Sequence, residues 1–276
     1  MFLASASAAL LVSRSLSRYP PKGGLAVRNF RGVETPVTGG LVLLVGLMVA
    51  EGLAALVSQF RGPPNVHEFF RPIHFLTLAL ALGFFALGAV DDLTGAGSAK
   101  GLLGHLKSLS RGEITGGIVK AGGGLALSFA ISRLRTWSFA GAVLDAVIIS
   151  LFANLFNLFD LRPGRSVKIF LAGSVLLLGS VWVSGHGLVI WALVGAAIVW
   201  LPVDLKEKGM LGDSGANMLG AVLGAGVAFS LPQNLSKLVM LVVLLGLTLV
   251  SEKWSFGDLI ERVPPLRWFD RLGRMP

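Results

Sequence analysis

Four aspartates stand next to glycine-rich turns at the ends of apolar segments. Asp91 and Asp92 end one apolar run, Asp160 ends another, and Asp213 begins a third. Adjacent carboxylates repel each other and stay ionised at low cost only beside a cation or a hydrogen-bond network. Oxygen ligands without His or Cys suit a hard cation, and Mg²⁺ usually takes one or two carboxylates together with substrate phosphates. Acids at helix ends can also mark only a membrane boundary, but three acidic sites beside such turns favour a metal and phosphate site.

A lysine follows the first acidic pair in the stretch G-A-V-D-D-L-T-G-A-G-S-A-K, residues 88–100. The glycine-punctuated turn can fold Lys100 back toward the acids, where an ammonium would bind a phosphate or a carboxylate. The sequence therefore indicates a cation close to the paired acids.

Two amides share a helix face with the next acid in the stretch N-L-F-N-L-F-D-L-R-P-G-R. A spacing of three residues places Asn154, Asn157 and Asp160 on one stripe of the last helical turns. Such a stripe is costly against lipid, so it should face a cavity. Arg162 and Arg165 flank a Pro-Gly pair that breaks the helix, and they supply cations that can bind phosphate.

Two further stretches place backbone groups near these side chains. In M-L-G-D-S-G-A-N, Asp213 stands at a predicted helix N-terminus, where exposed N–H groups favour anions and a metal-holding carboxylate could lie beside a phosphate. In R-N-F-R-G-V-E-T-P-V-T-G-G, the Thr35-Pro36 pair predicts an extended segment before the next helix. The Gly39-Gly40 pair lets another helix or a ligand approach the backbone, and close helix packing is the more frequent use.

The elements that must position these residues are membrane-spanning helices. The chain has 276 residues, of which 54% are hydrophobic and 14% charged, and its mean hydropathy is +0.76. An ordinary soluble domain carries about 25% charged residues, so a cytosolic enzyme and a disordered chain are excluded. The absence of Cys excludes disulfides, thiolate metal sites and a Cys nucleophile, and a net charge of +9 spread thinly along an apolar chain argues against a nucleic-acid partner. We predict an all-α, polytopic transmembrane bundle.

Uncharged runs of about 20 residues predict the spans. They lie near residues 38–58, 73–90, 114–131, 138–158, 167–184, 187–203, 215–231 and 235–250. A shorter ninth candidate covers about 2–13, and because basic residues follow it rather than precede it, we interpret it as a first span and not as a secretory signal. No polar segment is long enough for a soluble domain, so residues 1–276 are predicted to form a single integral membrane domain of about nine spans.

The basic residues predict the orientation of this bundle. Of the 24 Lys and Arg residues, 18 fall in one set of alternating loops and 5 in the other. The positive-inside rule places the first set in the cytoplasm, with the N-terminus outside and the C-terminus cytoplasmic, so that the four aspartates lie at cytoplasmic helix ends. The remaining residue, Lys120, lies within a span, where its stem can snorkel. The basic and aromatic segment 251–276 is predicted to be an interfacial cytoplasmic tail.

Four motifs in order carry a family resemblance. The series T-P-V-T-G-G, D-D-L-T-G-A-G-S-A-K, N-L-F-N-L-F-D and G-D-S-G resembles the polyprenyl-phosphate N-acetylhexosamine-1-phosphate transferases, or glycosyl transferase family 4. This superfamily includes the phospho-N-acetylmuramoyl-pentapeptide transferases and the GlcNAc-1-phosphate transferases. The resemblance implies Mg²⁺-dependent transfer of a phospho-amino-sugar from a UDP-sugar to a polyprenyl phosphate, with release of UMP, at the cytoplasmic face of the plasma membrane. A homodimer is compatible with it, although the sequence does not set the oligomeric state.

The resemblance also implies roles for individual residues. Asp91 and Asp92 match the paired aspartates, one of which helps to deprotonate or orient the lipid phosphate, and Asp213 matches the metal-binding aspartate. Asn157 and Asp160 match a stretch near the nucleotide and the metal. The residues expected to form the site are therefore catalytic Asp91, Asp92 and Asp160, metal-binding Asp213 and Asp92, and substrate-binding Lys100, Asn154, Asn157, Arg162, Arg165 and Thr38.

The chain departs from the family pattern in two places. Family members commonly continue as Asp-Gly-x-Asp-Gly from the position of Asp160, whereas this chain continues Leu161-Arg162-Pro163-Gly164 and lacks the second acid. Many members also carry a His-rich loop late in the chain, and here no His follows position 186. These departures keep open a catalytically divergent or silent membrane scaffold of the same fold.

A transporter is the alternative from another functional class. It predicts acids in mid-membrane and paired sequence halves, whereas the acids here gather toward one face and no repeat is detected. Glu51 and Asp145 do lie inside spans, and for them burial in a hydrogen-bonded pair is the simpler interpretation.

Overall fold

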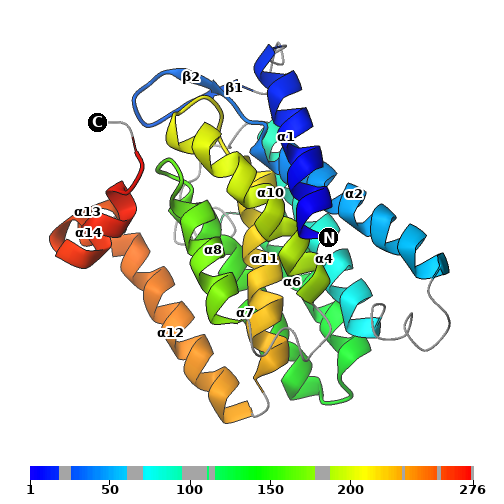
Figure 1. The fold of residues 1–276 in the computed structure, drawn as a ribbon. Coiled ribbons are helices and arrows are strands. Elements are labelled where there is room, and N and C mark those ends of the chain that lie inside the picture. The colour runs from blue at the N-terminus through cyan, green and yellow to red at the C-terminus, as the bar shows by residue number, and fades with distance from the viewer. Residues whose placement is uncertain are drawn as a thin grey trace.

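A helix lies at each of the nine predicted spans in the computed structural model (Figure 1). The structure describes residues 1–18, 26–60, 71–94, 111, 116–177, 187–231, 234–253 and 256–274, without the side chains of residues 252 and 253. The nine helices are α1 (Phe2–Arg18), α2 (Gly39–Phe60), α4 (Pro72–Thr94), α6 (Gly116–Arg135), α7 (Phe139–Phe159), α8 (Arg165–Leu176), α10 (Gly187–Leu205), α11 (Gly212–Ser230) and α12 (Asn234–Lys253).

The protein is an all-α, multi-pass membrane protein. Five helices of the described chain are long and apolar enough to cross a membrane, namely α2, α4, α7, α10 and the Asn234–Ser251 part of α12. Many large apolar side chains of α12 are exposed, as on a helix that faces lipid, among them Leu238, Val242 and Leu249. The count of nine spans and the sidedness of the two termini stay predictions.

Helix α11 occupies the centre of the bundle and packs against α7, α4 and α2. Sixteen of its residues are buried, mostly glycines, alanines and other small side chains. Small residues let neighbouring helix backbones approach closely, which is how helices associate where lipid weakens the hydrophobic drive. The central position of α11 brings its first residue, Gly212, to the meeting point of several other helix ends.

Helix α1 is an integral part of the bundle. It extends to Arg18, beyond the predicted segment 2–13, and packs against α10 and α2. The Ser5 hydroxyl donates a hydrogen bond to the Ala192 carbonyl oxygen over 2.6 Å. A buried hydroxyl that finds a partner on the neighbouring helix supports close packing of the two helices.

The two acids within the spans are each paired inside the protein, as expected. Asp145 of α7 is fully buried and forms ion pairs with Arg135 of α6, over 3.1 Å, and with Lys237 of α12. Glu51 of α2 lies 2.9 Å from His74 of α4. Because both groups have partners on neighbouring helices, they tie the helices together rather than mark a polar path through the bundle.

A short antiparallel hairpin adds strands that the sequence analysis does not predict. Strand β1 (Ala26–Arg28) pairs with β2 (Glu34–Pro36), and Gly32 takes a positive φ of 78° in the connecting turn. Beyond β2, Val37 forms a parallel bridge with Met210. The extended approach predicted from Thr35-Pro36 is therefore present; it pairs with β1, and the residue that follows it, Val37, has its partner about 170 residues further along the chain.

The C-terminal segment forms two short helices, α13 (Phe256–Arg262) and α14 (Pro264–Arg271), which lie beside the C-terminal end of α12 (Figure 1). Within α14 Asp270 is buried, while Leu266, Trp268 and the C-cap residue Leu272 are exposed. This two-sided character suits the predicted interfacial tail, which stays a prediction.

Candidate functional site

Three side chains from three helices meet at the end of the bundle. The Lys120 ammonium, from α6, lies 3.2 Å from the Asp91 carboxylate at the end of α4 and also forms an ion pair with Asp213 at the start of α11. The side chains of Asp91, Lys120 and Asp213 are 23%, 18% and 35% exposed, so substrate can reach the cluster. A cation between two carboxylates favours the ionised form of both. We call these three residues the acidic cluster.

Asp92 holds the start of α11 in place. Its two carboxylate oxygens accept hydrogen bonds from the backbone N–H groups of Asp213, over 2.8 Å, and Ser214, over 3.0 Å. The first N–H groups of a helix have no partner within the helix, and a carboxylate there satisfies them and interacts favourably with the helix dipole. Asp92 therefore acts as a capping residue supplied by another helix.

Two glycines allow α4 and the start of α11 to approach this closely. A Cβ atom at Gly88 would lie 2.5 Å from the Ser214 Cα atom, so only hydrogen fits there. Gly212 takes a positive φ of 77°, and a Cβ atom there would lie 2.2 Å from Val37 and 2.9 Å from the Asp92 carboxylate. The glycine that precedes Asp213 in the sequence thus turns the chain so that the N–H groups of α11 face Asp92.

Asp160 lies just beyond the end of α7, close to the same helix start. Burial raises the pKa of the Asp160 carboxyl well above its ordinary value, and the nearby carboxyls of Asp204, Asp213 and Asp92 raise it further. The Gly212 backbone N–H acts in the opposite direction by hydrogen bonding to the carboxylate. Asp160 therefore belongs electrostatically to the same acidic region, and it stays protonated to higher pH than an exposed aspartate.

Asp204, near the end of α10, brings a further carboxylate to this region. It is 4% exposed and accepts a hydrogen bond from the Gly164 backbone N–H over 3.0 Å. Gly164 has a positive φ of 70° and starts α8. The Asp204 carboxylate of α10 thus contacts the segment 161–164, which is where the family pattern has its second acid.

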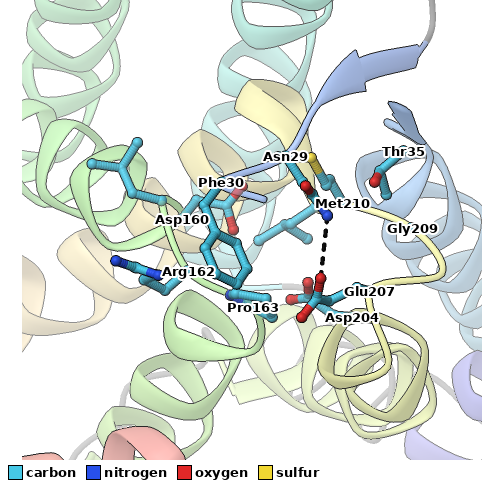
Figure 2. A pocket seen from close by; sticks show the side chains of 12 residues that line it. Asn29, Phe30, Thr35, Asp160, Arg162, Pro163, Asp204, Glu207, Gly209 and Met210 are labelled. Carbon is cyan, nitrogen blue, oxygen red and sulfur yellow. Dashed lines mark hydrogen bonds between the residues drawn. The ribbon is translucent and has the colours of Figure 1, made fainter. Parts of the chain in front are cut away.

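A small, partly open pocket lies between the hairpin, the segment after α7 and the loop that joins α10 to α11. The Arg162 guanidinium lies over the Phe30 ring, 4.5 Å from its centroid, on one side of the pocket. Asp204 and Glu207 line the other side, where the Asn29 amide donates a hydrogen bond to the Glu207 carboxylate over 3.2 Å (Figure 2). The pocket has a cationic and aromatic rim and an acidic wall, and Asp160 is part of its lining.

The other expected substrate-binding residues lie in different environments. Asn157 has a buried side-chain oxygen without a hydrogen-bond partner among the described residues, whereas Asn154 is exposed. Thr38 is buried, and its backbone N–H donates to the Met210 carbonyl oxygen over 3.2 Å. Arg165 is 4% exposed and forms a two-bond ion pair with Asp270, over 2.7 and 3.1 Å. Lys100 lies outside the described residues.

The sequence analysis missed three residues that the structure places in this region. It interpreted Lys120 as a snorkelling lysine, although a lone cation in an apolar span is itself a signal of a buried carboxylate partner. It overlooked Asp204, which is the only acid of its helix. It did not single out Phe30, because nothing in a single aromatic residue within a loop predicts the guanidinium that lies over it.

Possible metal ligands are few in this arrangement. Within the ranges that the structure describes, no three His, Cys, Asp or Glu side chains come together as a metal-binding group. Asp91 and Asp213 converge on one position, which the Lys120 ammonium holds, while both oxygens of Asp92 accept backbone hydrogen bonds. Two convergent carboxylates fit Mg²⁺, which takes its remaining ligands from water and substrate phosphates.

Comparison with known proteins finds relatives that share one name, phospho-N-acetylmuramoyl-pentapeptide-transferase. The chain is 27% identical to the protein of Desulforudis audaxviator over 278 aligned residues, covering 90% of this chain and 74% of the relative. It is 26% identical to the protein of Kocuria rhizophila, with 84% and 74% covered, and 28% identical to that of Desulforamulus reducens, with 84% and 72% covered. No family model matches the chain.

These relatives cover most of the chain, including the Asp91-Asp92 pair and the Gly-Asp-Ser-Gly stretch that form the acidic region. The identities below 30% agree with the altered segment after Asp160 and with the absence of a late His cluster. The chain is a distant relative of these transferases, which supports its membership of the polyprenyl-phosphate N-acetylhexosamine-1-phosphate transferase superfamily.

Proposed function

We propose that the protein transfers a phospho-amino-sugar from a UDP-sugar to a polyprenyl phosphate and releases UMP. The observation that carries this proposal is the acidic cluster, in which Lys120 holds Asp91 and Asp213 together beside a pocket at one end of the bundle. The names of the relatives support transfer of a phosphosugar to a lipid carrier in general. The distribution of basic residues supports a location in the plasma membrane with this end of the bundle in the cytoplasm.

The reaction brings two anions together. A phosphate oxygen of the polyprenyl phosphate would form a bond to the sugar-bearing phosphorus of the UDP-sugar, and the bond from that phosphorus to the bridging oxygen would break. UMP leaves with the bonding electron pair. Cations placed where negative charge develops lower the barrier most effectively when they are already in position. Lys120, held by two carboxylates, and Arg162, at the rim of the pocket, meet this requirement.

We further propose that Asp213 and Asp91 hold Mg²⁺ together with substrate phosphates. When bound, the ion would offset the charge of the two phosphates and stabilise the leaving UMP. Lys120 would then move toward a phosphate, because the ion takes over its place between the carboxylates. Asp92, the other expected ligand, would join only by releasing the N–H groups of α11 that it now caps.

The pocket is the proposed site of the nucleotide part of the donor. The Phe30 ring offers a flat surface for a base, and Arg162 offers a cation for the diphosphate. Asn157 does not line this pocket, and its unpartnered side-chain oxygen is buried within the described residues, so it is not assigned a contact with the donor. Asp160 would accept or donate a hydrogen bond at the boundary between the pocket and the acidic cluster.

A catalytically silent scaffold is the second candidate function. Two observations favour it: Asp92 has a structural role in capping α11, and the chain lacks the second acid and the late His cluster of the family pattern. Such a protein would keep the same fold and bind lipid or nucleotide without turnover. Transport has less support, because the acids within the spans are paired between helices.

The deciding experiment is exchange of labelled UMP with a nucleotide sugar. Purified protein would be incubated with undecaprenyl phosphate, Mg²⁺ and either UDP-GlcNAc or UDP-MurNAc-pentapeptide. We expect exchange that chelation abolishes and that Asp213→Asn and Asp91→Asn remove, while Glu261→Gln, at an exposed position of α13, retains it. Absence of exchange with a panel of nucleotide sugars from folded protein would favour the scaffold.

A further inference from the structure

The buried face of α14 carries a cluster of charges. The Asp270 carboxylate accepts from Arg165 Nε over 2.7 Å and from Arg165 Nη2 over 3.1 Å, and it also accepts from Arg274 over 2.7 Å. Asp270 and Arg165 are each 4% exposed. Two parallel bonds between a planar guanidinium and a carboxylate fix the relative orientation of the two groups as well as their distance.

A lysine from α8 binds the C-terminal end of the same short helix. The Lys168 ammonium donates to the backbone carbonyl oxygens of Phe269, Asp270 and Leu272, over 2.9, 2.6 and 3.2 Å. The last carbonyl groups of a helix have no partner within it, and a cation there satisfies them and interacts favourably with the helix dipole. Both Arg165 and Lys168 belong to the first turn of α8, so α14 is attached to that one turn.

The segment Leu161–Gly164 lies immediately before this turn and lines the pocket with its first three residues. We call this segment the pocket loop. It is held by Arg274, which follows the C-terminal end of α14 and whose Nε donates to the Pro163 carbonyl oxygen over 2.8 Å. From α10 it is held by Asp204, which accepts the Gly164 N–H over 3.0 Å. The pocket loop therefore lies between two fixed elements that are distant from it in the sequence.

The chemistry of these contacts points to positioning more than to stability. Burying charges costs much of what their attraction returns, so apolar side chains of similar volume would stabilise the docking of α14 about as well. Ion pairs and hydrogen bonds in fixed directions, in contrast, select one arrangement of the backbone. Glu261 of α13 and Arg271 of α14 form an exposed ion pair, at 46% and 64% exposure. This pair contributes little to holding α14 in place.

We infer that α14 is a strut that sets the conformation of the pocket loop, with Asp270 and Arg274 as positioning residues for the donor pocket. The strut would keep Arg162 at the pocket rim, over Phe30, because the residues that follow Arg162 are held at the Pro163 carbonyl and at the Arg165 side chain. The part of this inference that concerns the donor rests on the proposed function; the part that concerns the loop does not.

The test uses amide hydrogen exchange of the full-length protein in detergent micelles, without substrate. We expect Asp270→Asn and Arg274→Gln to raise exchange in residues 161–168 about tenfold, while exchange in α7 and α11 stays unchanged. Asp270→Glu should restore most of the protection. Glu261→Gln, which breaks only the exposed pair, is the matched control and should leave the pocket loop as in the parent protein.

A kinetic arm then tests the link to the donor. In UMP exchange, Asp270→Asn and Arg274→Gln should raise the KM for the nucleotide sugar about tenfold, with kcat changed much less, because the loop positions donor-binding groups rather than reacting ones.

Equal amide hydrogen exchange of the pocket loop in Glu261→Gln and Asp270→Asn, or faster amide exchange spread over the whole bundle, would overturn the strut. If Asp270→Asn does not fold, Arg274→Gln decides the question alone. A loop loosened as expected in a protein that turns over no nucleotide sugar would keep the strut and reject the proposed function.

Discussion

Lys120 of α6 and Asp213 of α11 form an ion pair across 93 residues of sequence. The same ammonium lies 3.2 Å from Asp91, so one cation joins the end of α4 to the start of α11. Without it, two carboxylates would face each other in a partly buried place, and one of them would take up a proton. The pair therefore controls the charge of the site as well as the packing of three helices.

Replacing Lys120 should remove activity while leaving the fold intact. In Lys120→Met the carboxylates lose the cation that keeps both ionised, and the developing negative charge of the reaction loses a preorganised partner. We expect UMP exchange to fall about 100-fold or more. Lys206→Met, which removes an exposed lysine at the same end of the bundle, is the control and should exchange UMP normally. Equal activity in the two variants would contradict the role given to Lys120.

The capping role of Asp92 can be separated from any chemical role. Asp92→Ala leaves two backbone N–H groups at the start of α11 without their acceptor, and we expect it to lower the free energy of unfolding by about 0.5–2 kcal/mol. Asp92→Asn keeps one acceptor oxygen and should lose less. Among the described residues, the Asp91 carboxylate accepts none of these backbone hydrogen bonds, so Asp91→Asn should change the free energy of unfolding least. Thermal unfolding in detergent measures all three, and equal stability of Asp92→Ala and Asp91→Asn would argue against the cap.

Gly212 should not tolerate a side chain. Gly212→Ala forces a non-glycine residue into a positive φ and places its Cβ atom 2.2 Å from Val37, so α11 must shift at its start. The expected loss is about 1–3 kcal/mol in the free energy of unfolding. Gly52 in α2 is the matched control, because no atom lies within 4 Å of the position of its Cβ. Gly52→Ala in a helix interior should be stabilising by up to about 1 kcal/mol, and the opposite order of the two variants would contradict this account.

The docking of α14 should depend on pH in the acid range. Burial alone would raise the pKa of Asp270, but Arg165 and Arg274 outweigh it and hold the pKa below its ordinary value of 3.8. A carboxyl with a lowered pKa in the folded protein contributes stability that is fully present above pH of about 4 and is lost as the pH falls through the folded-state pKa. The protection of residues 161–168 from amide hydrogen exchange should therefore decrease as the pH falls through the folded-state pKa of Asp270.

Asp270→Asn is the control for this acid effect. It lacks the titrating group, so its exchange in residues 161–168 should be faster than in the parent at neutral pH and should change little as the pH falls further. A parent protein whose pocket loop loses protection on acidification no sooner than α7 and α11 do would contradict the role of Asp270.

The sequence by itself determined that this is a membrane protein and where its helices lie along the chain. Long uncharged runs can only be helical in lipid, because every backbone polar group must find a partner within its own segment. The structure has a helix at each of the nine predicted segments, five of them long and apolar enough to cross a membrane, and it has Asp91, Asp92, Asp160 and Asp213 at helix ends. This local rule says nothing of the short hairpin of β1 and β2, because three-residue strands in a polar segment leave no mark in the hydropathy pattern.

Only the tertiary structure decided which helix ends meet. The pairing of Lys120 with Asp213, the approach of Asp204 to Gly164 and the burial of Arg165 against Asp270 each join residues between about 40 and 105 positions apart. Hydropathy and spacing describe one segment at a time, whereas helix neighbours in lipid are chosen by the fit of small residues and polar partners on several helices at once. For this reason the types of residue in the site could be predicted from the sequence, and the cation that holds them together could not.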